Sequence, residues 1–154
     1  MSEESAIERL KRAVIARTGH HYYSDKDKLL YERSRERMRA LGVATLEAYV
    51  DVLERGDGEE WRRLEDVITI GETYFFRYPE HFVALREDVL PRLIDARRSE
   101  RALRIWSIGC SNGAEPYSVA ILLRELLGSQ IDSWRIAIIG GDISEKALSA
   151  ARIA

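Results

Sequence analysis

The sequence predicts an α/β protein in which a small all-helical N-terminal domain precedes the first β-α-β-α of a Rossmann-like sheet. Up to about residue 70, apolar side chains recur at the spacing of amphipathic helices, without a strand pattern. Beyond residue 101, two short apolar runs alternate with helical patterns, which is typical of a parallel sheet. We therefore expect a helical domain over 1–70, a connecting segment over 71–101 and a Rossmann-like domain over 102–154.

The first two helices are marked by capping residues. Ser5 and Glu8 have the spacing of a capping box ahead of an apolar stripe, and Gly19 follows the stripe. Ser24 and Asp27 repeat the capping signal before a charged helix that runs to about residue 41.

Two further helices complete the N-terminal domain. The third is predicted from an apolar face at i, i+3, i+4 and i+7, formed by Leu46, Tyr49, Val50 and Leu53. Asp57 can cap a fourth helix, whose apolar side chains are Trp61, Leu64 and Ile68.

The connecting segment combines an aromatic motif with a helix. Phe75 and Phe76 are expected to anchor it in the core. Pro79 opens a helix with Phe82, Leu85 and Val89 on its apolar face, and Pro91 is expected to restart that helix.

The Rossmann-like domain is read from a strand over 103–108, a helix over 116–127 and a strand over 135–139, after which Ser144 caps a last helix. The continuous apolarity of the second strand suits a parallel strand buried on both faces. Two strands rarely make a stable sheet, so we expect the sheet to be incomplete within these 154 residues. We also expect the chain to self-associate through the region near 136–139, where an edge is exposed.

Composition excludes several classes of protein. The 24 basic and 26 acidic residues give a net charge of -2, which argues against a nucleic-acid partner. Cys110 is the only cysteine, so an internal disulfide is impossible and a reducing, cytoplasmic location is expected. The longest apolar run is far too short for direct membrane insertion. No metal site is predicted.

The turn after the first strand has two interpretations. Residues 109–113 satisfy G-x-S-x-G, the nucleophile elbow of serine hydrolases, with Ser111 as the nucleophile. The hydrolase order places a histidine after the serine, whereas all three histidines of this sequence precede Ser111. The alternative is a cradle in which Gly109 and Gly113 let the backbone approach a cofactor closely.

Three charged residues favour the cradle. Asp142 follows the second strand, where a carboxylate can accept the hydroxyls of a ribose, although it can also serve as a turn residue. Glu115 stands at a helix N-terminus, where it can bind an ammonium group or only offset the helix dipole. Arg77 can clamp a carboxylate or remain a surface charge. Adenosine, ammonium and carboxylate together describe S-adenosylmethionine.

The chain resembles the chemotaxis-type protein-glutamate O-methyltransferases of the CheR family. The matching segments are E-T-Y-F-F-R at 72–77, L-R-I-W-S-I-G-C-S-N-G-A-E-P-Y-S at 103–118 and G-D-I-S at 141–144. The resemblance implies that Thr73 and Arg77 line the methionine end of the cofactor, with Arg77 as the catalytic residue. The family commonly has two adjacent acids where this chain has Ala114 and Glu115.

The resemblance also implies a reaction and a partner. The reaction is S-adenosylmethionine-dependent methyl transfer to glutamate carboxylates on the cytoplasmic helical region of a methyl-accepting chemoreceptor. A glutamate is already ionised at neutral pH, with an ordinary pKa of about 4.3, so no general base is needed. The mixed charges of the second helix are either a solvated face or a basic stripe that meets an acidic receptor helix. The alternative function is a non-catalytic module that docks on a receptor or another partner.

Overall fold

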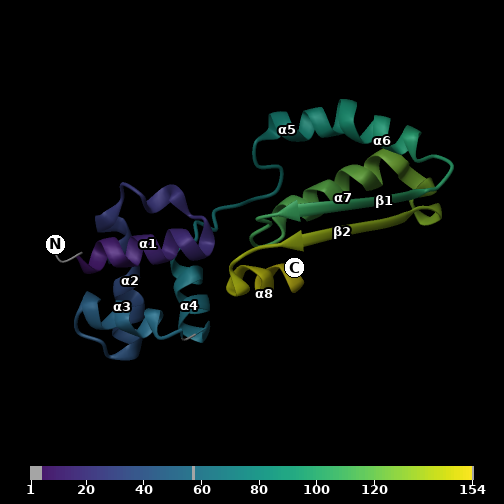
Figure 1. The fold of residues 1–154 in the computed structure, drawn as a ribbon. Helices are drawn as coiled ribbons and strands as arrows, with labels where there is room; N and C mark the ends of the chain where they lie inside the picture. Colours follow the sequence, from purple (N-terminus) through teal and green to yellow (C-terminus); the bar gives the residue numbers. More distant parts are fainter. Residues whose placement is uncertain (1–4, 57, 154) are drawn as a thin grey trace. The chain divides into compact units, whose positions relative to one another are not determined.

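The computed structural model describes residues 5–56 and 58–153, and the chain divides after Ile70 into two compact units. The first unit is helical, as predicted, and its described residues contain no strand. Its helices are α1 (Ala6–Thr18), α2 (Asp27–Leu41), α3 (Leu46–Glu54) and α4 (Gly58–Ile68), with a 3-10 turn at His21–Tyr23 (Figure 1).

The helix ends show where local signals decide the structure. The Ser5 hydroxyl accepts a hydrogen bond from the Glu8 amide at 3.4 Å, and Gly19 ends α1 with φ 71°, so the Ser5 cap and the end at Gly19 are confirmed. The Glu8 carboxylate accepts a hydrogen bond from Lys11 at 2.9 Å. The capping expectation for Ser24 is wrong, because its backbone is helical and α2 begins after Lys26, whose side chain makes no cap. Asp57, the expected cap of α4, lies outside the described residues.

The core of the first unit encloses a charged group. Glu60 is 2% exposed and accepts hydrogen bonds from Arg37 at 3.0 and 2.8 Å and from the Tyr49 hydroxyl at 2.8 Å. A buried charge is tolerated when it is paired and hydrogen-bonded in this way. Burial, together with the bond to Glu60, raises the pKa of Tyr49 above its ordinary value. The surrounding apolar side chains include Leu10, Val14, Leu30, Leu53 and Leu64.

The second unit starts with a helix that contains one widened turn. Helix α5 (Pro79–Ala84) continues through a π-helical turn (Leu85–Val89) into α6 (Leu90–Ala96). Pro91 has no amide hydrogen and its ring would clash with a carbonyl one turn earlier, and the widened turn lies directly before it. The extra residue of that turn shifts the apolar face. Leu90 is therefore buried while Val89 is 39% exposed, so the expectation that Val89 lies on the core face is wrong.

The sheet consists of two parallel strands. Strand β1 (Ala102–Ile108) pairs with β2 (Arg135–Gly141) in a register that runs from Ala102 opposite Arg135 to Ile108 opposite Gly141. The crossover contains α7 (Ala114–Leu127), which begins two residues before the predicted start, and a 3-10 turn (Gly128–Ser133). Helix α8 (Glu145–Arg152) follows β2, and both strand arrows point towards the turn that starts α7 (Figure 1).

Only one face of the sheet is covered by described residues. Leu103 of β1 packs in one cluster with Val119, Leu122 and Leu123 of α7 and with Phe82 and Leu90 of the preceding helices. The other face carries Trp106 at 70%, Ile108 at 72% and Ile139 at 59% exposure. The expectation that the second strand is buried on both faces is therefore wrong, because the helices of this unit pack on one side only.

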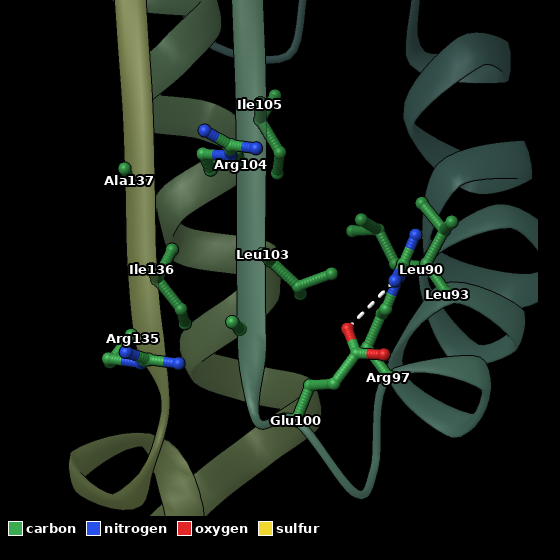
Figure 2. Close-up of a pocket in the computed structure, with 11 residues that line it drawn as sticks. Leu90, Leu93, Arg97, Glu100, Leu103, Arg104, Ile105, Arg135, Ile136 and Ala137 are labelled. Atoms are coloured by element: carbon green, nitrogen blue, oxygen red, sulfur yellow. Dashed lines mark hydrogen bonds and ion pairs between the residues drawn. The ribbon is translucent and has the colours of Figure 1, made fainter.

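A cavity of about 750 Å³ lies between α6 and the first halves of the two strands. Figure 2 shows Leu90, Leu93 and Leu103 at this cavity, with an ion pair between Arg97 and Glu100 at 2.7 Å. The cavity lies away from the carboxyl ends of the strands, where ligands bind in open α/β sheets. Among the described residues, no helix is long and apolar enough to cross a membrane.

Candidate functional site

The glycine-rich turn closes over the carboxyl end of the sheet. The amides of Gly109 and Cys110 both donate to the Gly141 carbonyl, at 2.7 and 3.0 Å, which ties the turn to the last residue of β2. Gly109 and Gly113 have φ values of 77° and 92°, a region that side chains disfavour. The two glycines predicted to form a cradle are therefore required by the backbone of the turn.

Close packing adds a second requirement for glycine. A Cβ on Gly113 would lie 3.0 Å from the Tyr117 ring and 3.1 Å from Ala151. A Cβ on Gly140 would lie 2.8 Å from the sulfur of Cys110, which is 2% exposed. Burial raises the pKa of the Cys110 thiol, so this cysteine behaves as a packing residue.

Asp142 connects the turn to the segment that follows β2. One carboxylate oxygen accepts the Ser111 amide at 2.8 Å, and the other accepts the Ser144 amide at 2.9 Å. Ser144 in turn caps α8 by accepting the Ala147 amide at 3.1 Å. Asp142 thus acts as a turn residue. Each of its carboxylate oxygens also keeps a lone pair that can accept a hydrogen bond from a hydroxyl group.

Glu115 lies in the first turn of α7 and its carboxylate is held by one partner. The hydroxyl of Ser107, a buried residue of β1, donates to Glu115 Oε1 at 2.6 Å. No other described residue donates to the carboxylate, so Oε2 stays available to an ammonium group. The positive end of α7 also favours an ionised acid at this position.

The segment over 71–78 is attached by two serines, one in the glycine-rich turn and one in α7. The Ser111 hydroxyl donates to the Gly71 carbonyl at 3.0 Å. The Phe76 amide donates to the Ser118 hydroxyl at 3.0 Å, and that hydroxyl donates to the Ala114 carbonyl at 2.6 Å. Thr73 is half-buried and lies between these two attachments. The chain therefore brings Thr73 and the first turn of α7 to one end of the sheet.

Arg77 is held by Glu72 and Tyr78. Its Nη1 donates to the Glu72 carbonyl at 2.6 Å, and its Nη2 donates to the Tyr78 hydroxyl at 3.1 Å. Phe76 packs edge to face on Phe82 with ring centroids 5.3 Å apart, which confirms its predicted place in the core. Phe75 is 52% exposed, so the expectation that it anchors the core is wrong.

The position of Ser111 weakens the hydrolase interpretation. A serine nucleophile donates its proton to a base, whereas the Ser111 hydroxyl donates to the Gly71 carbonyl. Ser111 is also not the helix cap, because Gly113 occupies that position and the Asn112 side chain accepts the Ala114 amide at 3.2 Å. The structure of the turn therefore favours the cradle over the nucleophile elbow.

The hydrogen-bond acceptors and donors at this end of the sheet suit S-adenosylmethionine. Asp142 and Glu115 offer carboxylate oxygens for a diol and an ammonium group, and Arg77 offers guanidinium donors for a carboxylate. The sequence did not indicate that Ser107 holds Glu115, that Tyr78 holds Arg77, or that Ser118 holds the backbone of the segment next to Arg77. A serine inside an apolar strand or helix indicates that its hydroxyl binds another polar group. The position of the serine in the sequence does not indicate which group it binds.

Comparisons with known proteins identify the family of this chain. Residues 5–69 match the CheR methyltransferase all-alpha domain, and residues 71–154 match the CheR methyltransferase SAM binding domain. A chemotaxis protein methyltransferase of Borreliella burgdorferi is 36% identical over 84% of this chain and 47% of that protein. The chemotaxis protein methyltransferase of Salmonella typhimurium is 32% identical over 97% of this chain and 49% of its own length. The Escherichia coli protein of the same name is 30% identical over the same shares. The chain thus spans about half the length of the curated relatives it matches.

Proposed function

Because the chain belongs to the CheR methyltransferase family, we propose that it forms part of an enzyme that methylates glutamate side chains of chemoreceptors. One observation carries the proposal. Asp142 and Glu115 follow the carboxyl ends of the two parallel strands, the segment of Arg77 is bound to the turn between them, and each of the three side chains is held by a hydrogen bond while keeping groups available for a ligand. These groups match the three polar parts of S-adenosylmethionine.

The residues have separate roles in this proposal. Asp142 accepts the ribose hydroxyls, Glu115 accepts the ammonium group, and Arg77 binds the carboxylate, with Thr73 beside it. Gly109 and Gly113 leave room for the ligand to approach the backbone of the turn.

When bound, S-adenosylmethionine supplies an electrophilic methyl group to the ionised carboxylate of the substrate glutamate. No residue of the chain needs to remove a proton, because that carboxylate has an ordinary pKa of about 4.3. The work of the chain is to hold and orient the reactants. Arg77 is the catalytic residue in the sense that it contacts the cofactor and fixes its methionine end.

Titration calorimetry with S-adenosylhomocysteine tests the binding roles. Asp142→Ala should weaken binding by about 1–3 kcal/mol, the range for a lost hydrogen bond to a charged group. Asp142→Asn keeps an acceptor for one of the two amides that Asp142 binds, and it should weaken binding less. Asp132→Ala removes an acid from the turn that follows α7 and serves as the matched control. Unchanged affinity in a folded Asp142→Ala protein would remove this residue from the site.

Methyl transfer tests the catalytic proposal against the docking module. Arg77→Lys keeps the charge but cannot reproduce the planar fork of donors, so it should lose transfer of tritiated methyl groups to receptor glutamates. Full transfer by Arg77→Lys would contradict the role of Arg77. A wild-type protein that binds a receptor without transferring methyl groups would instead favour a docking module.

The partner surface proposed for the receptor is on α2. Arg37 is occupied by Glu60, and Arg33 donates to the backbone at Val67 and Thr69. Arg35 and Arg39 are exposed, lie one turn apart and have no partner among the described residues. Reversing both charges should weaken methyl transfer at low salt without changing the affinity for S-adenosylhomocysteine.

The open face of the sheet supports a second association, between copies of this chain. Ile136 and Ile138 pack against the core, so the exposed apolar side chains are Trp106, Ile108 and Ile139. Light scattering at micromolar concentration should show association of the 154-residue chain, and Ile139→Lys should reduce it. A monomeric wild-type chain would contradict this proposal.

A further inference from the structure

The two residues that flank Arg77 have unusual backbone conformations. Phe76 has φ 57° and Tyr78 has φ 61°, both in the left-handed region that non-glycine residues rarely adopt. Strain of this kind persists where the surroundings impose it, and it clusters at functional sites. Phe76 packs its ring on Phe82, which accounts for its position. Tyr78 is 51% exposed, and its ring lies beside that of His81 with the centroids 5.6 Å apart, so it is packed much less than Phe76.

The left-handed conformation places the Tyr78 side chain against Arg77. The guanidinium carbon lies 4.8 Å from the centroid of the Tyr78 ring, which is a cation–π distance. The Tyr78 hydroxyl also accepts a hydrogen bond from Nη2 at 3.1 Å. On the other side, the Glu72 carbonyl accepts a hydrogen bond from Nη1 at 2.6 Å. The guanidinium is therefore fixed by contacts to its face and to both of its terminal nitrogens.

The contacts leave part of the guanidinium for a ligand. An arginine side chain has five N–H donors, and two of those of Arg77 are used by Glu72 and Tyr78. The remaining donors have no partner among the described residues. A planar carboxylate is the ligand class that matches a fixed fork of such donors.

We propose that Tyr78 is a positioning residue, which holds the Arg77 guanidinium in the orientation that binds the carboxylate of the cofactor. The proposal rests on the proposed function for the identity of the ligand. The contact between Tyr78 and Arg77 stands apart from that function and is measured separately below.

Two variants of Tyr78 separate the effect of its ring from the effect of its hydroxyl group, while keeping its backbone conformation. Tyr78→Phe keeps the ring and removes the acceptor. Tyr78→Asn removes both, yet asparagine tolerates the left-handed region, so the backbone is preserved. Tyr74 belongs to the same segment, is 57% exposed and has no side-chain partner among the described residues. Tyr74→Phe and Tyr74→Asn are therefore the matched controls.

The first measurement is arginine side-chain NMR of the full chain without ligand. A fixed guanidinium rotates slowly and gives separate Nη signals, which are assigned to Arg77 by their loss in Arg77→Lys. These signals should weaken in Tyr78→Phe, merge in Tyr78→Asn and remain in both Tyr74 variants. Tyr78→Asn should melt at or above the wild-type temperature, because an exposed strained residue has been replaced. Separate Arg77 signals that survive in Tyr78→Asn would overturn the proposal.

The second measurement is the affinity for S-adenosylhomocysteine by calorimetry. Loss of one cation–π contact and one hydrogen bond should weaken binding about tenfold in Tyr78→Asn, with a smaller loss in Tyr78→Phe. Unchanged affinity in Tyr78→Asn, where Arg77→Lys weakens binding, would overturn the positioning role. Unchanged affinity in Arg77→Lys would instead overturn the carboxylate role of Arg77, on which the ligand part of this inference depends.

Discussion

Replacing Gly140 by alanine tests how tightly the glycine-rich turn packs on β2. Gly140 does not have a positive φ, so the backbone itself accepts alanine. The added Cβ would lie 2.8 Å from the Cys110 sulfur and 3.3 Å from the Cys110 Cβ. Cys110 cannot retreat easily, because it is buried and its amide is bound to the Gly141 carbonyl at 3.0 Å.

The expected size of the effect follows from these contacts. Overpacking of a rigid core site lowers the stability by about 1–3 kcal/mol. Replacing a glycine inside a strand raises the stability by about 0.5–1 kcal/mol, because the unfolded chain becomes less flexible. Gly140→Ala should therefore destabilise the sheet by about 1–2 kcal/mol. In the double variant with Cys110→Ala the 2.8 Å contact is gone, so most of the loss should be recovered.

Gly141→Ala is the matched control, since its Cβ would lie 3.7 Å from Trp106 Nε1, which is an ordinary contact. Hydrogen exchange of the β2 amides, followed by NMR in the native state, gives the local free energy of opening. Equal protection in the Gly140 and Gly141 variants would refute the reasoning. So would a double variant that is no more stable than Gly140→Ala alone.

Three further outcomes are expected. Ser107→Ala removes the donor that orients Glu115, and it should weaken S-adenosylhomocysteine binding severalfold in calorimetry; equal affinity would contradict that role. Burial raises the pKa of Tyr49, so the folded state holds this proton more tightly than the unfolded state. Its stabilising contribution is therefore complete below about pH 10 and is lost above it, and circular dichroism should show a melting temperature that falls from about pH 10 upwards and not before. Burial also raises the pKa of Cys110, so iodoacetamide should modify it far more slowly in the native chain than in urea; similar rates would show an accessible thiol.

The elements that sequence predicts well are those whose signals are local. The buried side chains Tyr49, Val50 and Leu53 of α3 follow from helical spacing, and the two strands follow from short apolar runs. Gly109 and Gly113 mark the turn because only glycine adopts their φ values easily. The positions of Glu115 after β1 and of Asp142 after β2 can likewise be read directly from the sequence.

The features that sequence did not predict depend on distant partners. Ser118 binds Phe76 across 42 positions, and no spacing rule indicates that pair. The exposure of Phe75 and the contact of Tyr78 with Arg77 occur next to positive φ values at Phe76 and Tyr78, which non-glycine residues rarely adopt and which no sequence pattern indicates. The π-helical turn is similar, because Pro91 indicates a disturbance in the helix but not the residue that leaves the core face.

Ser111 has a consequence for how the two ends of a ligand communicate. Its amide donates to Asp142 and its hydroxyl donates to Gly71, so one residue joins the acid proposed to bind the ribose to the segment that carries Arg77. Ordering Asp142 around one part of a ligand also restrains Gly71, and the entropy lost in fixing the second part is smaller as a result. For the proposed ligand, we therefore expect the free-energy effect on binding of changing Asp142 and Arg77 together to differ from the sum of the two separate effects.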